Sequence, residues 1–166
     1  LQEAKSIILG HLPKPGERSA ALSSSLGSVL AEKVVSTLDV PGFGRASMDG
    51  YAVISLDTIE AREDRPVSLR LAGSVPMGRR PDLQISPGEA AEVSTGSMMP
   101  DGADAVVMIE YSQFQDGQVL IRRPVYSGEN VQAAGSDISF GEAVFFPGTP
   151  IAAREIGVLA ALGREC

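Results

Sequence analysis

Cysteine and histidine are almost absent from this chain of 166 residues, which has one cysteine, Cys166, and one histidine, His11. A single cysteine excludes an internal disulfide and a cysteine-based metal cluster. With one histidine and one cysteine, the chain has few residues from which a Ser-His-Asp or Cys-His arrangement of nucleophilic catalysis could be built. This cysteine usage fits a reducing compartment, and we expect a cytoplasmic protein.

Long hydrophobic runs and an excess of positive charge are also missing. No apolar segment approaches the length needed to cross a bilayer, and no basic amphipathic segment favours attachment to a membrane surface. The net charge is −7 and the pI is about 4.7, which argues against nucleic acid as the main partner. The first residues show neither a signal-peptide pattern nor an initiating methionine, so we expect the sequence to begin inside a longer reading frame.

Hydrophobic residues make up 43 % of the sequence, which is enough for the core of one domain or two small ones. Their spacing predicts helices over residues 1–12, 20–31 and 151–162. Short runs bounded by Gly, Pro and Asp predict strands at residues 32–38, 51–54, 67–72, 90–93, 105–109, 119–121 and 141–148. Asp116-Gly117, between Phe114 and Val119, is the strongest hairpin signal.

The change of pattern along the chain predicts a mixed, β-rich α+β fold. We expect a small β-barrel-like domain at residues 40–126, inserted into an elongated α/β segment. That segment, a linker or dimerisation domain, is built from both flanks, residues 14–39 and 127–166. The N-terminal helix, residues 1–13, precedes it. The resemblance described below supports the same division.

The segment around Asp49 is the first candidate for a functional site. It begins with the structure-breaking pair Pro41-Gly42 and ends in a predicted strand. Asp49 precedes Gly50, the residue type that best tolerates positive φ, so its carboxylate is expected on a bend. From the residues alone, an ordinary turn aspartate and a functional carboxylate both remain open.

Four segments match, in order, the motifs of one protein family. Residues 47–52 (SMDGYA) are similar to AMDGYA, and residues 88–107 contain a run similar to TGAPxPxGADAVV. Residues 135–142 are similar to GxDIxxG, and residues 156–163 (IGVLAALG) to IGxLAALG. On these matches, which cover nearly the whole chain, the sequence resembles the molybdopterin molybdenumtransferases, the family of MoeA and the gephyrin E-domain.

The resemblance implies a transferase of molybdenum cofactor biosynthesis. Such enzymes insert molybdate into adenylylated molybdopterin and release AMP, with a divalent cation such as Mg²⁺. It implies that Asp49 is the carboxylate nearest the metal and the phosphates, and that Thr95 is the hydroxyl and backbone donor nearest the substrate. Ser47, Ser94 and Gly96 are expected to contribute to substrate binding.

The resemblance also implies partners. Family members form an elongated homodimer in which the barrel of one chain faces the pterin-binding domain of the other, and a molybdopterin-adenylylating enzyme is a possible upstream partner. The family continues beyond the position of Cys166 into that α/β domain, on which the helix of residues 1–13 normally packs. We therefore expect an N-terminal fragment that contributes half of an active site at the dimer interface and does not catalyse alone.

Three departures from the family pattern keep other functions open. One is that residues 95–98 read TGSM where the family has TGAP. Residues 44–47 read GRAS where the family usually has DNSA, which exchanges an acid and an amide for a cation. An arginine that usually lies shortly before GxDI is absent, and residues 132–134 read QAA. The alternatives are a catalytically weakened, gephyrin-like scaffold or dimerisation module, and an unrelated β-rich binding module.

Other polar residues have weaker claims to function. A backbone-capping role is expected for Asp104, a turn-forming role for Asp137 and a solvated position for Glu110. The arginine pairs at residues 79–80 and 122–123 are interpreted as surface charge.

Overall fold

The computed structural model describes residues 2–11 and 16–166 of the chain. Helix α1 (Gln2–His11) occupies the first of these ranges and confirms the helix predicted from the hydrophobic spacing at the N-terminus. Leu1 and residues 12–15, which complete that prediction and the segment after it, lie outside the described residues. None of the described helices has the length and hydrophobicity needed to cross a membrane.

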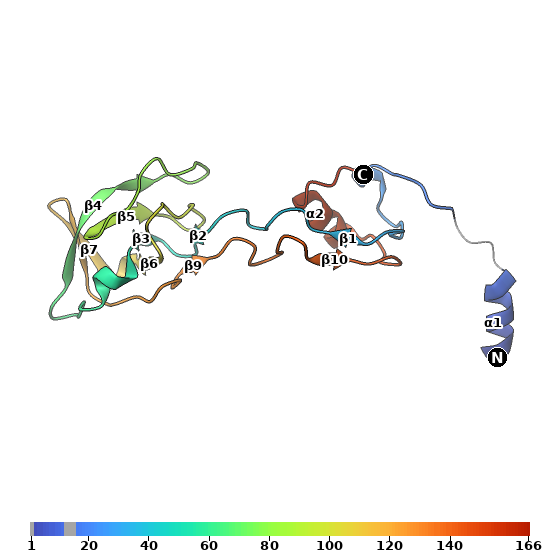
Figure 1. Cartoon of the computed structure of the whole chain (residues 1–166), viewed down its shortest axis with the longest axis horizontal. Coiled ribbons are helices and arrows are strands. Elements are labelled where there is room, and N and C mark those ends of the chain that lie inside the picture. The colour runs from blue at the N-terminus through green and yellow to red at the C-terminus, as the bar shows by residue number, and fades with distance from the viewer. Residues whose placement is uncertain (1, 12–15) are drawn as a thin grey trace. The chain divides into compact units, whose positions relative to one another are not determined.

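The chain divides into two compact units (Figure 1). The larger unit spans residues 36–142, and the smaller one combines residues 1–35 with residues 143–166. These limits lie outside the predicted boundaries at residues 40 and 126, and the assignment of an inserted barrel and flanking linker stays a prediction.

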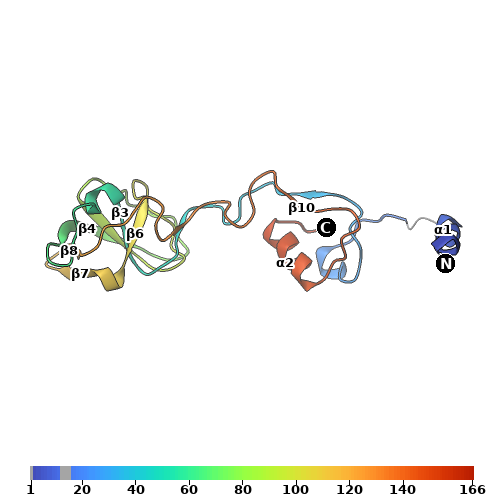
Figure 2. The same cartoon turned by 90° about the horizontal axis from the view of Figure 1, so that it is seen from below.

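The larger unit is built on a curled, six-stranded half-barrel, which Figures 1 and 2 show from two directions. Its strands are β3 (Gly50–Val53), β4 (Val67–Val75), β5 (Glu89–Val93), β6 (Ala105–Met108), β7 (Ser112–Gln115) and β8 (Gln118–Ile121). The order across the sheet is β6-β3-β5-β4-β8-β7, with β4 and β5 parallel and the other neighbours antiparallel. The strands predicted in this region are all present, so the β-rich fold is confirmed.

Both faces of this sheet are covered by the chain itself. Tyr51 and Val53 of β3 pack into one hydrophobic core, whereas Ala52, which lies between them, packs into a second core on the opposite face. Neighbouring β6 repeats the arrangement, with Val107 in the first core and Val106 in the second. Burial on both faces explains why these strands are continuous apolar runs and do not alternate with polar residues.

The predicted hairpin joins β7 to β8 at Asp116-Gly117. Both residues have positive φ, 52° for Asp116 and 80° for Gly117, which is the pattern of a type I′ turn. Strand β4 is longer than predicted, because it continues to Val75, which is buried in the second core. The connection to the next strand therefore begins after residue 75.

Two shorter ladders complete the described strands. In the larger unit, β2 (Arg45–Ala46) pairs with β9 (Val131–Gln132). In the smaller unit, β1 (Val34–Val35) pairs with β10 (Ala143–Phe145), and helix α2 (Ala153–Ala161) confirms the C-terminal helix. The strands predicted at residues 32–38 and 141–148 are thus present in shortened form.

The helix predicted over residues 20–31 is wrong. Only a single 3₁₀ turn, η1 (Leu22–Ser24), forms there. The Ser24 hydroxyl donates to the Ala21 carbonyl and the Ser25 hydroxyl donates to the Leu22 carbonyl, so serine side chains compete for the acceptors of a helix. Gly27 then adopts a positive φ of 80°, which ends any continuation.

Candidate functional site

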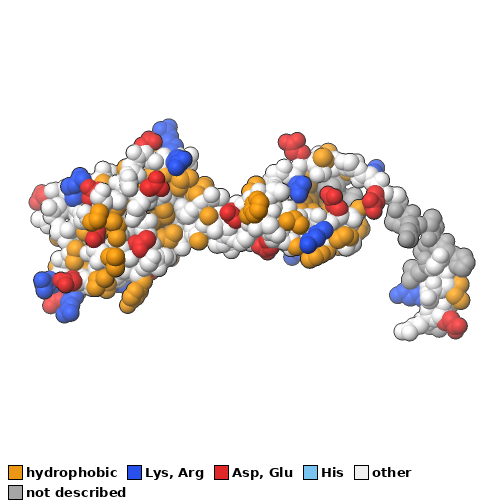
Figure 3. Space-filling view, viewed as in Figure 1, with side chains coloured by type: hydrophobic (Ala, Val, Ile, Leu, Met, Phe, Trp, Pro, Cys, Tyr) orange, Lys and Arg blue, Asp and Glu red, His pale blue; other side chains and the backbone are white. Residues whose placement is uncertain are grey.

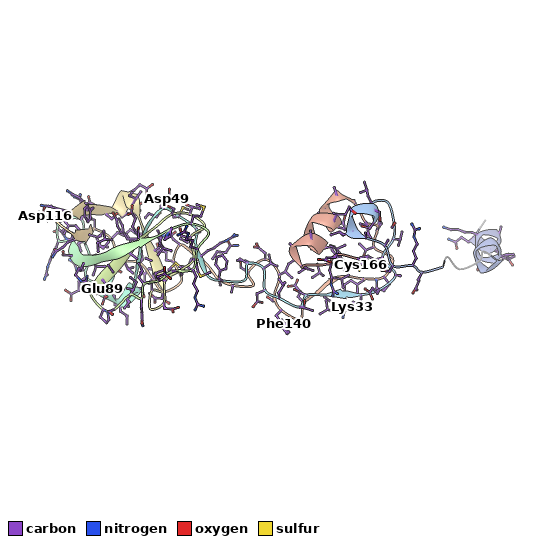
Figure 4. All side chains as sticks on the ribbon, turned by 90° about the horizontal axis from the view of Figure 1, so that it is seen from above. Lys33, Asp49, Glu89, Asp116, Phe140 and Cys166 are labelled. Carbon is purple, nitrogen blue, oxygen red and sulfur yellow. The ribbon has the colours of Figure 1, made fainter. Side chains whose placement is uncertain are left out.

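Asp49 lies on a tight bend immediately before strand β3, in the larger unit (Figure 4). The next residue must be glycine, because a Cβ on Gly50 would lie 1.9 Å from the Val107 carbonyl oxygen and because its φ is 156°. The Asp49 carbonyl accepts a hydrogen bond of 3.0 Å from the Ile109 N–H. Close packing of β3 on β6 therefore fixes the bend, while the Asp49 side chain stays exposed.

Thr95 lies on a second turn, directly after strand β5. The Ser97 N–H donates to the Ser94 carbonyl at 2.9 Å, and Gly96 at the third position has a φ of 87°, as in a type II turn. The turn is anchored to β2, because Ala46 donates its N–H to the Ser97 carbonyl and accepts the Gly96 N–H. These backbone bonds bring the second turn next to the segment that leads to the first bend.

The two turns meet through Asp49 and Thr95. The Thr95 N–H donates to Asp49 Oδ1 at 2.7 Å, and the Thr95 hydroxyl donates to the same oxygen at 2.9 Å. These two bonds hold the pKa of the Asp49 carboxyl below its ordinary value, with the backbone bond making the larger contribution. The carboxylate is therefore charged, exposed and held in one orientation.

The remaining oxygen of this carboxylate is the group available to a ligand. Asp49 Oδ2 makes no hydrogen bond to the described part of the chain. Both donors of Thr95, in contrast, are directed at Asp49. In this structure Thr95 orients the carboxylate, and its expected role as a donor to the substrate stays a prediction.

The predicted substrate-binding residues lie on the same two turns. Ser47 and Ser94 are exposed, and their hydroxyls have no hydrogen-bond partner among the described residues. The Gly96 N–H is instead used in the bond to Ala46. The two serine hydroxyls are thus free to contact a ligand, whereas Gly96 serves the shape of its turn.

Asp104 has the structural role expected for it. Its carboxylate accepts the Ser55 N–H at 2.6 Å and the Ser55 hydroxyl at 2.8 Å, and so caps the 3₁₀ helix η2 (Ser55–Thr58). Burial raises the pKa of the Asp104 carboxyl, but hydrogen bonds from Ser55 and Ser127 outweigh it, and the net pKa lies below the ordinary value. Both oxygens of this carboxylate are used within the protein.

The arginine pair at residues 122–123 also behaves as interpreted. Arg122 lies 3.7 Å from Glu63, and Arg123 forms an ion pair with Glu129. Acidic and basic side chains are interspersed on the face of the larger unit drawn in Figure 3. These arginines already have acidic partners and offer little to an anionic ligand.

Sequence reasoning missed a chain of polar contacts that begins in β2. Arg45 Nε donates to Gln132 Oε1 at 2.7 Å, and Gln132 Nε2 donates to Asp137 Oδ1 at 3.1 Å. The sequence contains no signal for this contact, because Arg45 and Gln132 are 87 residues apart and meet only through the register of β2 and β9.

A surface cavity near this chain of contacts was also missed. Its volume is about 300 Å³. It is lined by Gly42, Phe43, Arg80, Pro81, Met98, Met99 and Asp101.

The donor set at Asp49 suits a magnesium ion that is shared with a substrate. In the part of the chain that the structure describes, no group of three or more His, Cys, Asp or Glu side chains can hold a metal ion. Mg²⁺ is nevertheless commonly bound by one or two carboxylates, with phosphate oxygens and water completing its shell. The free oxygen of Asp49 fits that pattern, whereas a metal held by the protein alone does not.

The fold and the site together define a class of module, a curled β-sheet that presents an oriented carboxylate with one free oxygen where two turns meet. Residues 1–163 match the family described as the MoeA N-terminal region (domain I and II). Because the match covers nearly the entire chain, the chain belongs to this family, as the sequence motifs indicated.

Curated relatives and solved structures agree with this assignment. The chain is 33 % identical over 165 residues to the molybdopterin molybdenumtransferase of Nostoc sp., covering 97 % of this chain and 38 % of the relative. It is 34 % identical over 158 residues to the Bacillus subtilis protein of the same name, covering 92 % of this chain and 37 % of the relative. A crystal structure of the molybdopterin biosynthesis MoeA protein from Pyrococcus horikoshii matches 99 % of this chain and 44 % of its own, with a TM-score of 0.93 and 34 % identity. The chain thus spans about two fifths of the relatives' length.

Proposed function

We propose that this chain supplies the N-terminal part of a molybdopterin molybdenumtransferase, which inserts molybdate into adenylylated molybdopterin and releases AMP. The names of the relatives support a role in molybdenum cofactor biosynthesis. The observation that carries the proposal is the contact of Thr95 with Asp49, because it holds a charged carboxylate open to solvent on the turns that the family motifs single out.

Each residue of the site has a role that follows from its contacts. Asp49 would hold Mg²⁺ through its free oxygen, and the bound ion would neutralise charge on the phosphates of the substrate. Thr95 keeps the carboxylate ionised and fixes its direction. The exposed hydroxyls of Ser47 and Ser94 would bind the polar groups of the substrate beside it.

The chain would contribute half of an active site. In this proposal the larger unit faces the pterin-binding domain of a second protomer, in a homodimer, and a molybdopterin-adenylylating enzyme delivers the substrate. The relatives' additional length supports the need for further domains. The chain alone is therefore expected to bind ligands without completing the reaction.

A chimaera tests this function. The matching segment of the Bacillus subtilis relative is replaced by this chain, and the chimaera is produced in cells that lack their own molybdenumtransferase. We expect it to restore molybdenum cofactor, measured as the molybdenum content and activity of a molybdoenzyme. Asp49→Asn should abolish this restoration, because the amide has no charge to offer a metal.

Asp104→Asn is the matched control, since it removes an equal charge from a carboxylate whose oxygens are both occupied. A chimaera with Asp49→Asn that restores cofactor as well as the parent would contradict the assignment of Asp49. A folded, dimeric chimaera that never restores cofactor would favour the scaffold alternative.

A further inference from the structure

Arg45 stands out among the arginines of the chain. The ion pairs of the described residues use Arg70, Arg122, Arg123 and Arg154. Among the described arginines that form no ion pair, Arg45 is half-buried and the rest are exposed. Arg45 therefore has no acidic partner among the described residues. Withdrawing a charge from water without a counter-charge costs free energy, so this position requires a compensating contact.

The contact that Arg45 does make orients it without neutralising it. Its Nε donates to the neutral Gln132 amide at 2.7 Å, and that amide is held in turn by Asp137 at 3.1 Å. The two Nη groups of Arg45 have no hydrogen-bond partner in the described part of the chain. A planar guanidinium fixed at one edge therefore keeps its other donors for an acceptor from outside, and an oxyanion matches this fork best.

The backbone places Arg45 next to the strand residue that anchors the second turn of the candidate site. Its strand residue pairs with Gln132 on one side and forms a bridge with Met98 on the other. The next residue, Ala46, is hydrogen-bonded to both Gly96 and Ser97 of the turn that carries Thr95. Arg45 is thus one residue away from the point where β2 anchors that turn.

We propose that Arg45 binds a tetrahedral oxyanion, either a phosphate group of the adenylylated substrate or molybdate, beside the Asp49–Thr95 contact. The identity of that anion rests on the proposed function, whereas its binding to Arg45 does not. Gln132 is a positioning residue that sets the direction of the guanidinium.

Two of the departures from the family pattern support this assignment. One of them introduces a cation at Arg45, and the other removes one shortly before GxDI. The structure makes Arg45 and Gln132 direct cross-strand partners, so both changes affect the same place on the β2–β9 ladder. Arg45 thus supplies a cation opposite the segment of residues 132–134, where the family's arginine is missing.

Isothermal titration calorimetry of the protein at low ionic strength tests the proposal, with pyrophosphate, AMP and molybdate as separate probes. We expect the wild-type chain to bind at least one of them. Arg45→Gln should weaken that binding about tenfold or more, the effect of losing a charge-assisted contact. Arg79→Gln is the matched control, because it removes an equal charge from an exposed arginine and should leave the affinity unchanged.

A charge exchange gives the sharpest result. The double variant Arg45→Gln with Gln132→Arg should recover most of the lost affinity, since the cation returns to the same place from the opposite strand. The NMR signal of the Arg45 Nε–H in the wild-type chain should also shift during titration, which needs no variant to fold. Binding of the phosphate probes alone identifies the substrate phosphate, and binding of molybdate alone identifies molybdate.

Three results would overturn the proposal: no binding of any probe by the wild-type chain, equal effects of Arg45→Gln and Arg79→Gln, or an unmoved Arg45 Nε–H signal at saturation. None of these depends on turnover. A chimaera that fails to make cofactor while Arg45 still binds an oxyanion would remove the proposed reaction and leave this binding site in place.

Discussion

The two ends of strand β3 carry the same chemical group with different consequences. Asp49 precedes the strand and Asp104 caps the helical turn that follows it, and hydrogen bonds leave both carboxyls with a pKa below the ordinary value. Asp104 is half-buried and uses both oxygens on Ser55, whereas Asp49 is exposed and uses one oxygen on Thr95. The free oxygen and its exposure, and not the pKa, therefore distinguish a candidate ligand from a structural cap.

The backbone at the Asp49 end gives the largest expected effect. Gly50→Ala should destabilise the protein by about 3 kcal/mol or more, because the new Cβ would overlap the Val107 carbonyl and the backbone of β6 cannot move aside. Urea unfolding followed by circular dichroism measures this change.

Gly117→Ala in the β7–β8 turn is the control for that variant. Gly117 also has positive φ, but a Cβ added there would meet no atom within 4 Å, so only the conformational cost of about 1 kcal/mol should remain. Equal losses for Gly50→Ala and Gly117→Ala would show that the close approach of β3 to β6 does not fix the bend.

Removing the two carboxylates should separate the two ends of the strand. Asp104→Ala should lower the free energy of unfolding by about 2 kcal/mol, because it breaks two bonds to Ser55 and leaves the N–H of this buried residue unpaired. Asp49→Ala should have a much smaller effect, since the exposed Thr95 groups can bond to water. Chemical denaturation of the two variants side by side tests this order, and the reverse order would contradict the comparison.

Acid should weaken the Asp104 end of the strand. A carboxyl whose folded pKa is lowered stabilises the protein above its unfolded pKa, about 3.9, and that stability is lost as the pH falls through the lower folded value. The wild-type free energy of unfolding should therefore fall below about pH 4. In the Asp104→Asn variant, the free energy of unfolding should depend less steeply on pH between neutral and acidic conditions. An unchanged slope would show that Asp104 does not contribute to the acid dependence.

The smallest expected effect concerns the Thr95 hydroxyl. Thr95→Val removes one of the two donors to Asp49, so the pKa of that carboxyl should rise part of the way toward its ordinary value. Thr95→Ser keeps the hydroxyl and should leave the pKa where it is. Carbon-13 NMR titration of the Asp49 carboxyl distinguishes the two variants, and an identical pKa in both would assign the shift to the backbone bond alone.

The features that could be predicted from the sequence depend on local patterns. Apolar strands and the Asp116-Gly117 hairpin follow from side-chain burial and turn geometry, which a short window reveals. The helix expected at residues 20–31 failed because serine hydroxyls compete with helical hydrogen bonds there.

The candidate site could be predicted only in part, because its contacts join residues that are far apart in the sequence. The contact of Asp49 with Thr95 joins residues 46 positions apart, and the family motifs alone indicated that they work together. The contact of Arg45 with Gln132 depends on strands of two residues, which are too short to leave a pattern in the sequence. Long-range pairings of this kind are visible only in the folded chain.

The most direct test of the distinction between the two aspartates is the response of their carboxyl carbon-13 signals to Mg²⁺ in the presence of pyrophosphate. The Asp49 signal should shift in a saturable way, since its free oxygen can bind the cation, while the Asp104 signal should stay in place because both of its oxygens are occupied. A shift at Asp104 equal to that at Asp49, or no shift at Asp49 at saturating Mg²⁺, would contradict the account.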